Sequence, residues 1–203
     1  HYDQMADYSE CNQKSYQSWL AREYPDLNTL NHLYGTNYSS WQEIRIPRPV
    51  QRKYSCLGAL RKRPDEQQVI DYYRYHNWLI ADSIIWFCNQ VKSFSNGNLL
   101  AGAFYGYTGE IMNTDFGHHA LEIVLNSPSV DFIASPNSYL NARSPDNDWP
   151  YIAMVDSAKL HGKLWFFECD TRTAQTRLLK DSRADVCPDA PIYEGGVWVG
   201  PES

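Results

Sequence analysis

Three polar residues that follow an apolar run are the part of this sequence best suited to chemistry. Residues 164–167 are apolar, and Glu168, Asp170 and Arg172 come directly after them. A carboxylate is costly in apolar surroundings unless it sits at an open strand end, and Arg172 is near enough along the chain to keep either carboxyl group ionised. An ionised carboxylate with a second carboxyl group about 5 Å away is the catalytic pair of a retaining glycosidase. A structural ion pair between Glu168 and Arg172 is the alternative.

Two other apolar runs, residues 99–107 and 130–135, also read as buried strands. The residues at and after their ends are polar or aromatic: Tyr105, Tyr107, Asn137 and Tyr139. Because the carboxyl ends of parallel strands meet at one edge, these side chains are expected to lie near Glu168. Aromatic rings, hydrogen-bonding groups and a carboxylate together are what a sugar-binding site requires.

The elements that position these residues alternate along the chain. Helical periodicity is predicted for residues 12–24, 27–34 and 65–95, with Asp65 as the N-cap of the third helix. Shorter helices are predicted over 118–126 and 149–161, between the strands 99–107, 130–135 and 163–168. Residues 36–64 lack periodicity, and Pro47 and Pro49 interrupt them. Alternating helices and strands predict an α/β fold with a parallel sheet, either a barrel or a doubly wound sheet. No glycine-rich phosphate loop follows a strand, which disfavours a dinucleotide-binding fold.

Composition narrows the classes of partner. The net charge of −6 and scattered basic residues argue against nucleic-acid binding, and no run of roughly 18 apolar residues suggests a membrane span. Seven Trp and fifteen Tyr favour sugar stacking, with Trp41 and Trp149 as candidates. Five cysteines without a C-x-x-C spacing predict neither a disulfide framework nor a metal site, and no cofactor is expected. Free thiols favour the cytoplasm; a secreted protein would need a signal peptide before His1.

Other polar residues carry weaker interpretations. His118 and His119 are adjacent, so a shared metal is disfavoured and a helix start or solvent-facing pair is expected. Glu110 and Asp115 follow the first strand, where they could touch substrate or remain solvated.

Several stretches resemble glycoside hydrolase family 42. The similar positions are Trp19-Leu20, Tyr24-Pro25, Leu27, Leu30-Asn31, Tyr34-Gly35-Thr36, Trp41-Gln42-Glu43-Ile44, Pro47 and the segment 71–75. Tyr34 stands where that family usually has Trp, and Cys11 is what remains of its cysteine cluster, so no metal site is carried over. The order of three strands ending near Tyr105, Asn137 and Glu168 also agrees.

The resemblance implies a (β/α)8 TIM barrel and a retaining β-galactosidase, with Glu168 as the nucleophile at the end of strand seven. Tyr139 would then hydrogen-bond Glu168. The whole chain, residues 1–203, would be the C-terminal part of one catalytic barrel domain. Residues 1–64 would be the helix and long loop after strand four, and residues 65–203 would be βα units five to seven with the start of eight. The acid/base Glu would precede His1 and be missing from the chain.

The expected partner is an oligosaccharide or polysaccharide, and open sheet edges make a homo-oligomer possible. Two alternatives stay open: a non-catalytic carbohydrate-binding or scaffold protein derived from the same barrel, and an unrelated α/β enzyme in which Glu168 pairs with Arg172.

Overall fold

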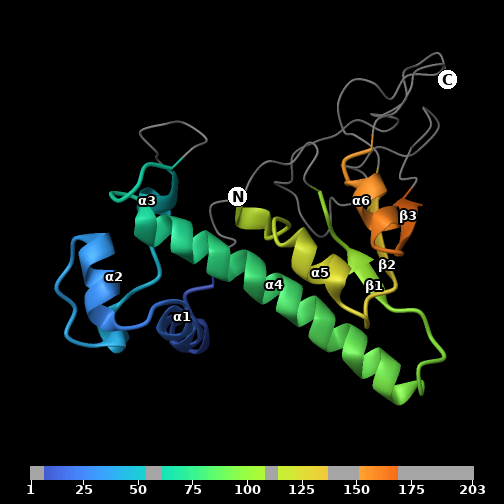
Figure 1. Ribbon diagram of the computed structural model, residues 1–203, viewed down its shortest axis with the longest axis horizontal. Coiled ribbons are helices and arrows are strands. Elements are labelled where there is room, and N and C mark those ends of the chain that lie inside the picture. The colour runs from blue at the N-terminus through green and yellow to red at the C-terminus, as the bar shows by residue number, and fades with distance from the viewer. Residues whose placement is uncertain (1–6, 54–60, 108–113, 137–150, 169–203) are drawn as a thin grey trace, which may run out of the picture. The chain divides into compact units, whose positions relative to one another are not determined.

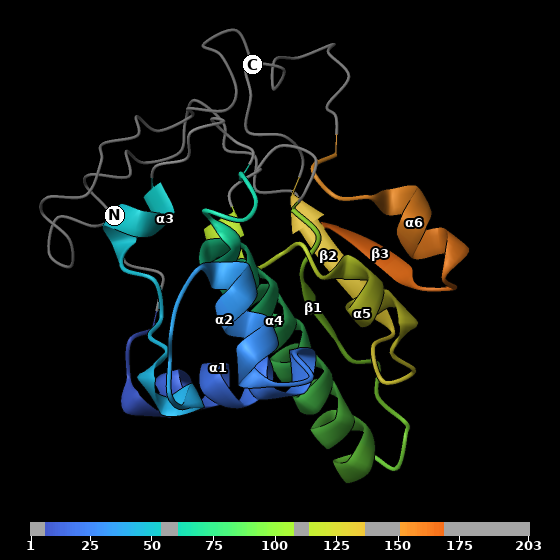
Figure 2. The same cartoon turned by 60° about the vertical axis from the view of Figure 1, so that its left-hand side comes forward.

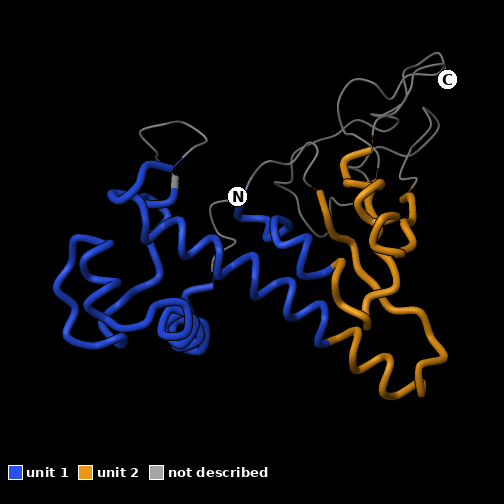
Figure 3. The backbone as a smooth tube through the Cα atoms, in the orientation of Figure 1, with its two compact units in different colours: residues 1–86, 113–124 blue, residues 87–112, 125–203 orange. Residues whose placement is uncertain are grey.

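The computed structural model describes residues 7–53, 61–107, 114–136 and 151–168 (Figure 1). The chain divides into two compact units (Figure 3). Unit 1 comprises residues 1–86 and 113–124, and unit 2 comprises residues 87–112 and 125–203. The candidate site residues outside the described ranges are Glu110, Asn137, Tyr139, Trp149, Asp170 and Arg172.

Unit 1 begins with two capped helices, as the periodicity predicts. In α1 (Glu10–Glu23) the Ser9 hydroxyl accepts the Asn12 N–H at 3.2 Å. In α2 (Leu27–Tyr34) the Asp26 carboxylate accepts the Thr29 N–H at 2.7 Å. Each cap satisfies a backbone donor that the first helical turn leaves unpaired. Gly35 ends α2 in the left-handed conformation, with φ of 65°.

The stretch predicted to be irregular contains two short elements, η2 (Trp41–Glu43) and α3 (Pro49–Lys53). Pro49 begins α3 instead of interrupting the stretch. Proline is well suited to the first helical position, where its missing N–H costs no intrahelical hydrogen bond. The Gln51 side chain accepts the Arg48 N–H at 2.8 Å and supports that first turn.

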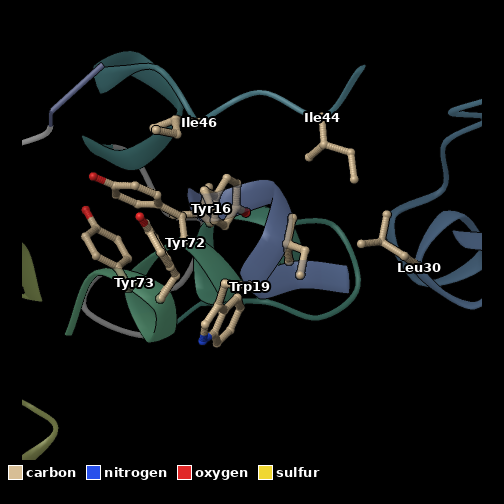
Figure 4. Close-up of a cluster of buried hydrophobic side chains, with 10 residues drawn as sticks. Tyr16, Trp19, Leu30, Ile44, Ile46, Tyr72 and Tyr73 are labelled. Carbon is tan, nitrogen blue, oxygen red and sulfur yellow. The ribbon is translucent and has the colours of Figure 1, made fainter. Parts of the chain in front are cut away.

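The long helix α4 (Gln67–Phe94) supplies the main face of the unit 1 core (Figure 4). It begins two residues after Asp65, so the predicted N-cap is wrong. Asp65 instead forms an exposed ion pair with Lys62 at 3.0 Å. The buried core joins residues of α1, α2 and α4 with the segment before α3: Tyr16, Trp19, Leu20, Leu30, Ile44, Ile46, Val69, Tyr72, Tyr73 and Tyr75. This ring-rich core accounts for much of the tyrosine excess.

Unit 2 contains a parallel sheet with the order β1-β2-β3. Its strands are β1 (Gly102–Phe104), β2 (Phe132–Pro136) and β3 (Leu164–Glu168). They lie side by side in Figure 2, where α6 (Val155–Leu160) is next to β3. Gly102 faces Phe132 at close range, because a Cβ on Gly102 would lie 2.1 Å from the Phe132 carbonyl oxygen. The predicted parallel α/β arrangement is therefore present in the described sheet.

Three sequence predictions need correction in the strands and short helices that follow α4. The first strand is only three residues long, and Leu99 and Leu100, predicted to be buried, are 59% and 60% exposed. Among the described residues β1 pairs with β2 alone, so β1 is an edge strand of the described sheet. The predicted helix 149–161 is seen only over Val155–Leu160 within the described range. The predicted helix 118–126 begins late: α5 spans Leu121–Asn126, and a separate turn, η3 (Thr114–Phe116), precedes it.

Asp131 joins the starting ends of all three strands. Its carboxylate accepts the Ala101 N–H at 2.7 Å and pairs with Lys92 Nζ at 2.5 Å. Its backbone carbonyl accepts the Leu164 N–H at 2.9 Å. Desolvation opposes ionisation of this carboxyl group, but the hydrogen bonds from Lys92 and Ala101 outweigh it and lower the pKa of Asp131.

We expect Asp131→Asn to lower the free energy of unfolding by roughly 1–3 kcal/mol at neutral pH, because it removes a charge-assisted hydrogen bond. The folded-state pKa of Asp131 is depressed, so its contribution is present at neutral pH and is lost as pH falls through that pKa. Urea denaturation of wild type and variant at pH 7 and pH 3 measures this difference, which should shrink at pH 3. Exposed Asp156→Asn is the control. An equal loss at both pH values would contradict the ionised contact.

Candidate functional site

Glu168 is the last residue of β3 and stands opposite Pro136 of β2. Its side chain is half-buried. Because successive strand residues point to opposite faces, Glu168 shares a face with Phe166. The ring of Phe166 contacts that of Phe132 edge to face, with centroids 4.9 Å apart. The carboxylate therefore sits at the carboxyl end of a parallel sheet, beside an aromatic pair.

The other face of β3 is held by aromatic contacts. The Trp165 indole N–H donates to Ser135 Oγ at 3.1 Å, and the Tyr151 ring lies 4.6 Å from the Trp165 ring. Phe167 adds a third ring, 5.9 Å from Trp165. These contacts support the strand residues on either side of Phe166, next to the end of β3 that carries Glu168.

Tyr105 and Tyr107 follow β1 at the same edge of the sheet. The Tyr105 N–H donates to the Ala134 carbonyl at 3.1 Å, which places Tyr105 next to Ser135. The Tyr105 side chain is fully buried, at 0% exposure, so its ring offers no open face to a sugar in this structure. Tyr107 is half-buried and retains accessible surface. The structure thus brings Tyr105 and Glu168 to one sheet edge.

Trp41 belongs to unit 1, where it lies in η2 and packs, half-buried, against the core. Asp115 also belongs to unit 1, and its interpretation as a solvated loop carboxylate is wrong. It forms an ion pair with Arg52, which is buried, and the Arg52 guanidinium also lies over the Tyr72 ring, 5.4 Å from its centroid.

A buried carboxylate that the sequence analysis missed lies at the centre of unit 1. Asp71 is 0% exposed. One of its carboxylate oxygens accepts hydrogen bonds from the hydroxyl groups of Tyr24 and Tyr34, the latter at 2.9 Å. The other oxygen accepts from Gln67 at 3.0 Å and from Arg74 at 3.3 Å. Burial raises the pKa of both tyrosine hydroxyls, and the neighbouring Asp71 charge raises it further. The sequence offered one sign of this buried carboxylate, a single Asp on a helix face that otherwise carries buried tyrosines.

The hydrogen bonds of Asp71 account for some of the positions that resemble glycoside hydrolase family 42. Tyr24, Tyr34 and the segment 71–75 are far apart in the chain and are among the positions that resemble glycoside hydrolase family 42. Here their side chains meet in one hydrogen-bonded cluster. A Trp in place of Tyr34 would also present a single N–H donor, so the departure at this position preserves a hydrogen-bonding role.

Within the described ranges, no three His, Cys, Asp or Glu side chains gather as a metal site would require. No described helix combines the length and apolar character needed to cross a membrane.

Comparison with known proteins decides the family. The family model of glycoside hydrolase family 42, described as beta-galactosidase, matches residues 1–186. The chain belongs to glycoside hydrolase family 42. No curated protein matches the chain. The match confirms the resemblance found in the sequence, and it assigns the chain to a family of β-galactosidase-type glycoside hydrolases.

His118, a half-buried histidine near the start of α5, is expected to make the folded protein less stable in acid. Burial, followed by the nearby His119, lowers the pKa of His118 from 6.5 to about 4. Between these values the unfolded chain binds a proton that the folded chain does not, so stability falls as pH falls through this window. We expect His118→Gln to reduce the loss of Tm between pH 6.5 and pH 4, measured by thermal melts followed by circular dichroism. His161→Gln, at an exposed histidine, is the control. Parallel pH dependence in wild type and His118→Gln would refute the assignment.

Proposed function

We propose that this family 42 chain is part of a retaining β-galactosidase whose nucleophile is Glu168. The observation that carries the proposal is the place of Glu168 at the carboxyl end of a parallel strand in a chain matched by the beta-galactosidase model over residues 1–186. In (β/α)8 barrels catalytic groups stand at this end of the strands. We propose that β1, β2 and β3 are strands five, six and seven of such a barrel, within one catalytic domain spanning residues 1–203.

The proposed reaction proceeds through two displacements. A Glu168 carboxylate oxygen attacks the anomeric carbon as the bond to the leaving oxygen breaks, and a second carboxyl group protonates that oxygen. The product is a galactosyl ester of Glu168. That second group, now ionised, then removes a proton from water, which attacks the same carbon and releases galactose with its original configuration.

Sugar recognition in the proposed site uses polar and aromatic residues from the three strand ends. Tyr107 is the described residue suited to direct contact, because it is only half-buried. Tyr105, fully buried, supports the strand end in this account. The remaining proposed contacts after these strands are Asn137, Tyr139, Trp149, Asp170 and Arg172. Trp41, in η2 of unit 1, stays a separate proposed stacking residue. In this proposal Tyr139 donates a hydrogen bond to Glu168, and a tryptophan supplies a stacking face.

Proton NMR of the first product tests the proposal directly. The substrate is 2,4-dinitrophenyl β-galactoside, whose leaving group needs little acid assistance, so the assay depends mainly on the nucleophile. The account predicts that β-galactose appears first and equilibrates slowly to the α anomer. Early α-galactose would show an inverting enzyme. Binding of galactosides without turnover by a folded chain would instead support a carbohydrate-binding protein derived from the same barrel.

A further inference from the structure

The connection from α4 to β1 contains Asn96-Gly97, the one Asn-Gly pair in the sequence (Figure 1). Both residues are exposed and have left-handed backbone conformations, with φ of 50° at Asn96 and 78° at Gly97. The Asn96 N–H donates to the Ser93 carbonyl at 3.3 Å, and the Gly97 N–H donates to the Lys92 carbonyl at 2.8 Å. These two hydrogen bonds form a Schellman motif, which satisfies carbonyl groups that a helix C-terminus leaves unpaired.

An exposed Asn-Gly pair can react with itself. Glycine has no side chain to shield its backbone nitrogen, and no described residue other than its chain neighbours lies within 4 Å of the Cβ position at Gly97. Once this nitrogen loses its proton, it can attack Cγ of Asn96. As the new N–Cγ bond forms, the Cγ–Nδ2 bond breaks, and Nδ2 takes up a proton and leaves as ammonia. Water then opens the resulting succinimide at either carbonyl and gives aspartate or isoaspartate.

The hydrogen bonds of the motif oppose this reaction in the folded protein. While the Gly97 N–H donates to the Lys92 carbonyl, the nitrogen keeps its proton and is directed away from attack. The Lys92 side chain holds the turn a second time, because its Nζ donates to the Leu99 carbonyl at 2.8 Å and pairs with Asp131. We propose that Asn96 is a site of spontaneous deamidation and that local opening of the last turn of α4 controls its rate.

Deamidation would change the end of α4 irreversibly. In isoaspartate the main chain runs through the side-chain carbons and is one carbon longer, so the two hydrogen bonds of the motif cannot both form. The last carbonyl groups of α4 then lose their partners in the turn. The Tm is therefore expected to fall as isoaspartate accumulates.

Peptide mapping by mass spectrometry tests the site in the whole chain. Folded protein and the same protein unfolded in urea are incubated at neutral pH, sampled over time and digested, and isoaspartyl methyltransferase labels the isoaspartate. We expect Asn96 to convert in both samples, at least about tenfold more slowly in the folded one, because attack requires local opening. In the unfolded sample Asn98, which precedes Leu99, should convert more slowly than Asn96. An unreactive Asn96 in the folded protein, or equal rates in the two samples, would overturn the proposal.

Lys92→Met tests the control of the rate by the turn. The change removes the side-chain contacts of Lys92 and leaves the Asn-Gly pair itself intact. Deamidation of the folded variant, with folding established by circular dichroism, is expected to be several times faster than in wild type. Lys159→Met makes the same change at an exposed position of α6 and should leave the rate unchanged. Equal rates in Lys92→Met and wild type would contradict control by the turn.

Asn96→Gly keeps the consequence testable if Lys92→Met unfolds. Glycine suits the left-handed position and preserves the motif, but it has no side-chain amide to lose. Thermal melts are recorded before and after prolonged incubation. Wild type should lose Tm as isoaspartate accumulates, and Asn96→Gly should keep its initial Tm. An equal loss in the two proteins would refute the link between deamidation and the end of α4.

Discussion

Glu168→Gln is expected to reduce kcat/KM for 2,4-dinitrophenyl β-galactoside by at least about a thousandfold, because an amide cannot form the covalent glycosyl-enzyme. The change is nearly isosteric and lies at a half-buried strand end, so the fold should survive it. Initial rates of dinitrophenolate release measure the effect. Glu122→Gln makes the same chemical change at an exposed carboxylate of α5 and should keep wild-type activity.

Chemical rescue distinguishes a nucleophile from a residue that merely supports the site. In Glu168→Gly the vacated space admits azide, which attacks the anomeric carbon from the side that Glu168 occupied. The expected product is α-galactosyl azide, formed at a rate that rises with azide concentration. Activity in Glu168→Gln similar to wild type, or a β-azide product, would be incompatible with the assigned role.

Asp71→Ala is expected to lower the free energy of unfolding by roughly 3–5 kcal/mol, the range seen when one partner of a buried charged cluster is removed. The change leaves the hydroxyls of Tyr24 and Tyr34 and the amide of Gln67 without their acceptor. A loss of this size is a large share of the stability of an ordinary domain. Urea denaturation measures it, with Asp82→Ala, at an exposed position of the same helix, as the control.

Tyr34 allows the hydrogen bond to be separated from the packing. Tyr34→Phe removes the donor to Asp71, whereas Tyr34→Trp replaces the hydroxyl with an indole N–H. We expect Tyr34→Phe to cost about 1–3 kcal/mol and Tyr34→Trp to cost clearly less. Wild-type stability in Asp71→Ala, or equal losses in the two Tyr34 variants, would contradict the account of this cluster.

The long helices could be predicted from sequence because each combines a repeating apolar face with a local stop signal. In α1 the spacing of Tyr16, Trp19 and Leu20 is visible without tertiary information, and Gly35 marks the end of α2. The parallel arrangement of the strands could be predicted as well, since short apolar runs alternate with helical segments.

Other features depend on contacts between distant residues and could not be predicted. The length of α3 depends on Pro49 at its start, whereas sequence reasoning treats a proline in an aperiodic stretch as a break. The burial of Asp71 depends on Tyr24 and Tyr34, which reach it from other helices. Asp115 looked like a loop carboxylate because its partner, Arg52, is 63 positions away.

The exposure of β1 was mispredicted, because an apolar run shows that a segment favours burial but does not show which neighbouring elements cover it. The candidate site shows the same limit. The sequence predicts that Tyr105 and Glu168 lie at strand ends, and the structure confirms this for both. Only the structure shows that the Tyr105 side chain is buried.

Covalent trapping tests the central claim most directly. The protein is incubated with 2,4-dinitrophenyl 2-deoxy-2-fluoro-β-galactoside, digested and analysed by mass spectrometry, with circular dichroism on the same sample to establish folding. The account predicts a 2-deoxy-2-fluorogalactosyl adduct on the peptide containing Glu168, absent from Glu168→Gln. A folded, active protein that carries the adduct on a different carboxylate would show that Glu168 is not the nucleophile.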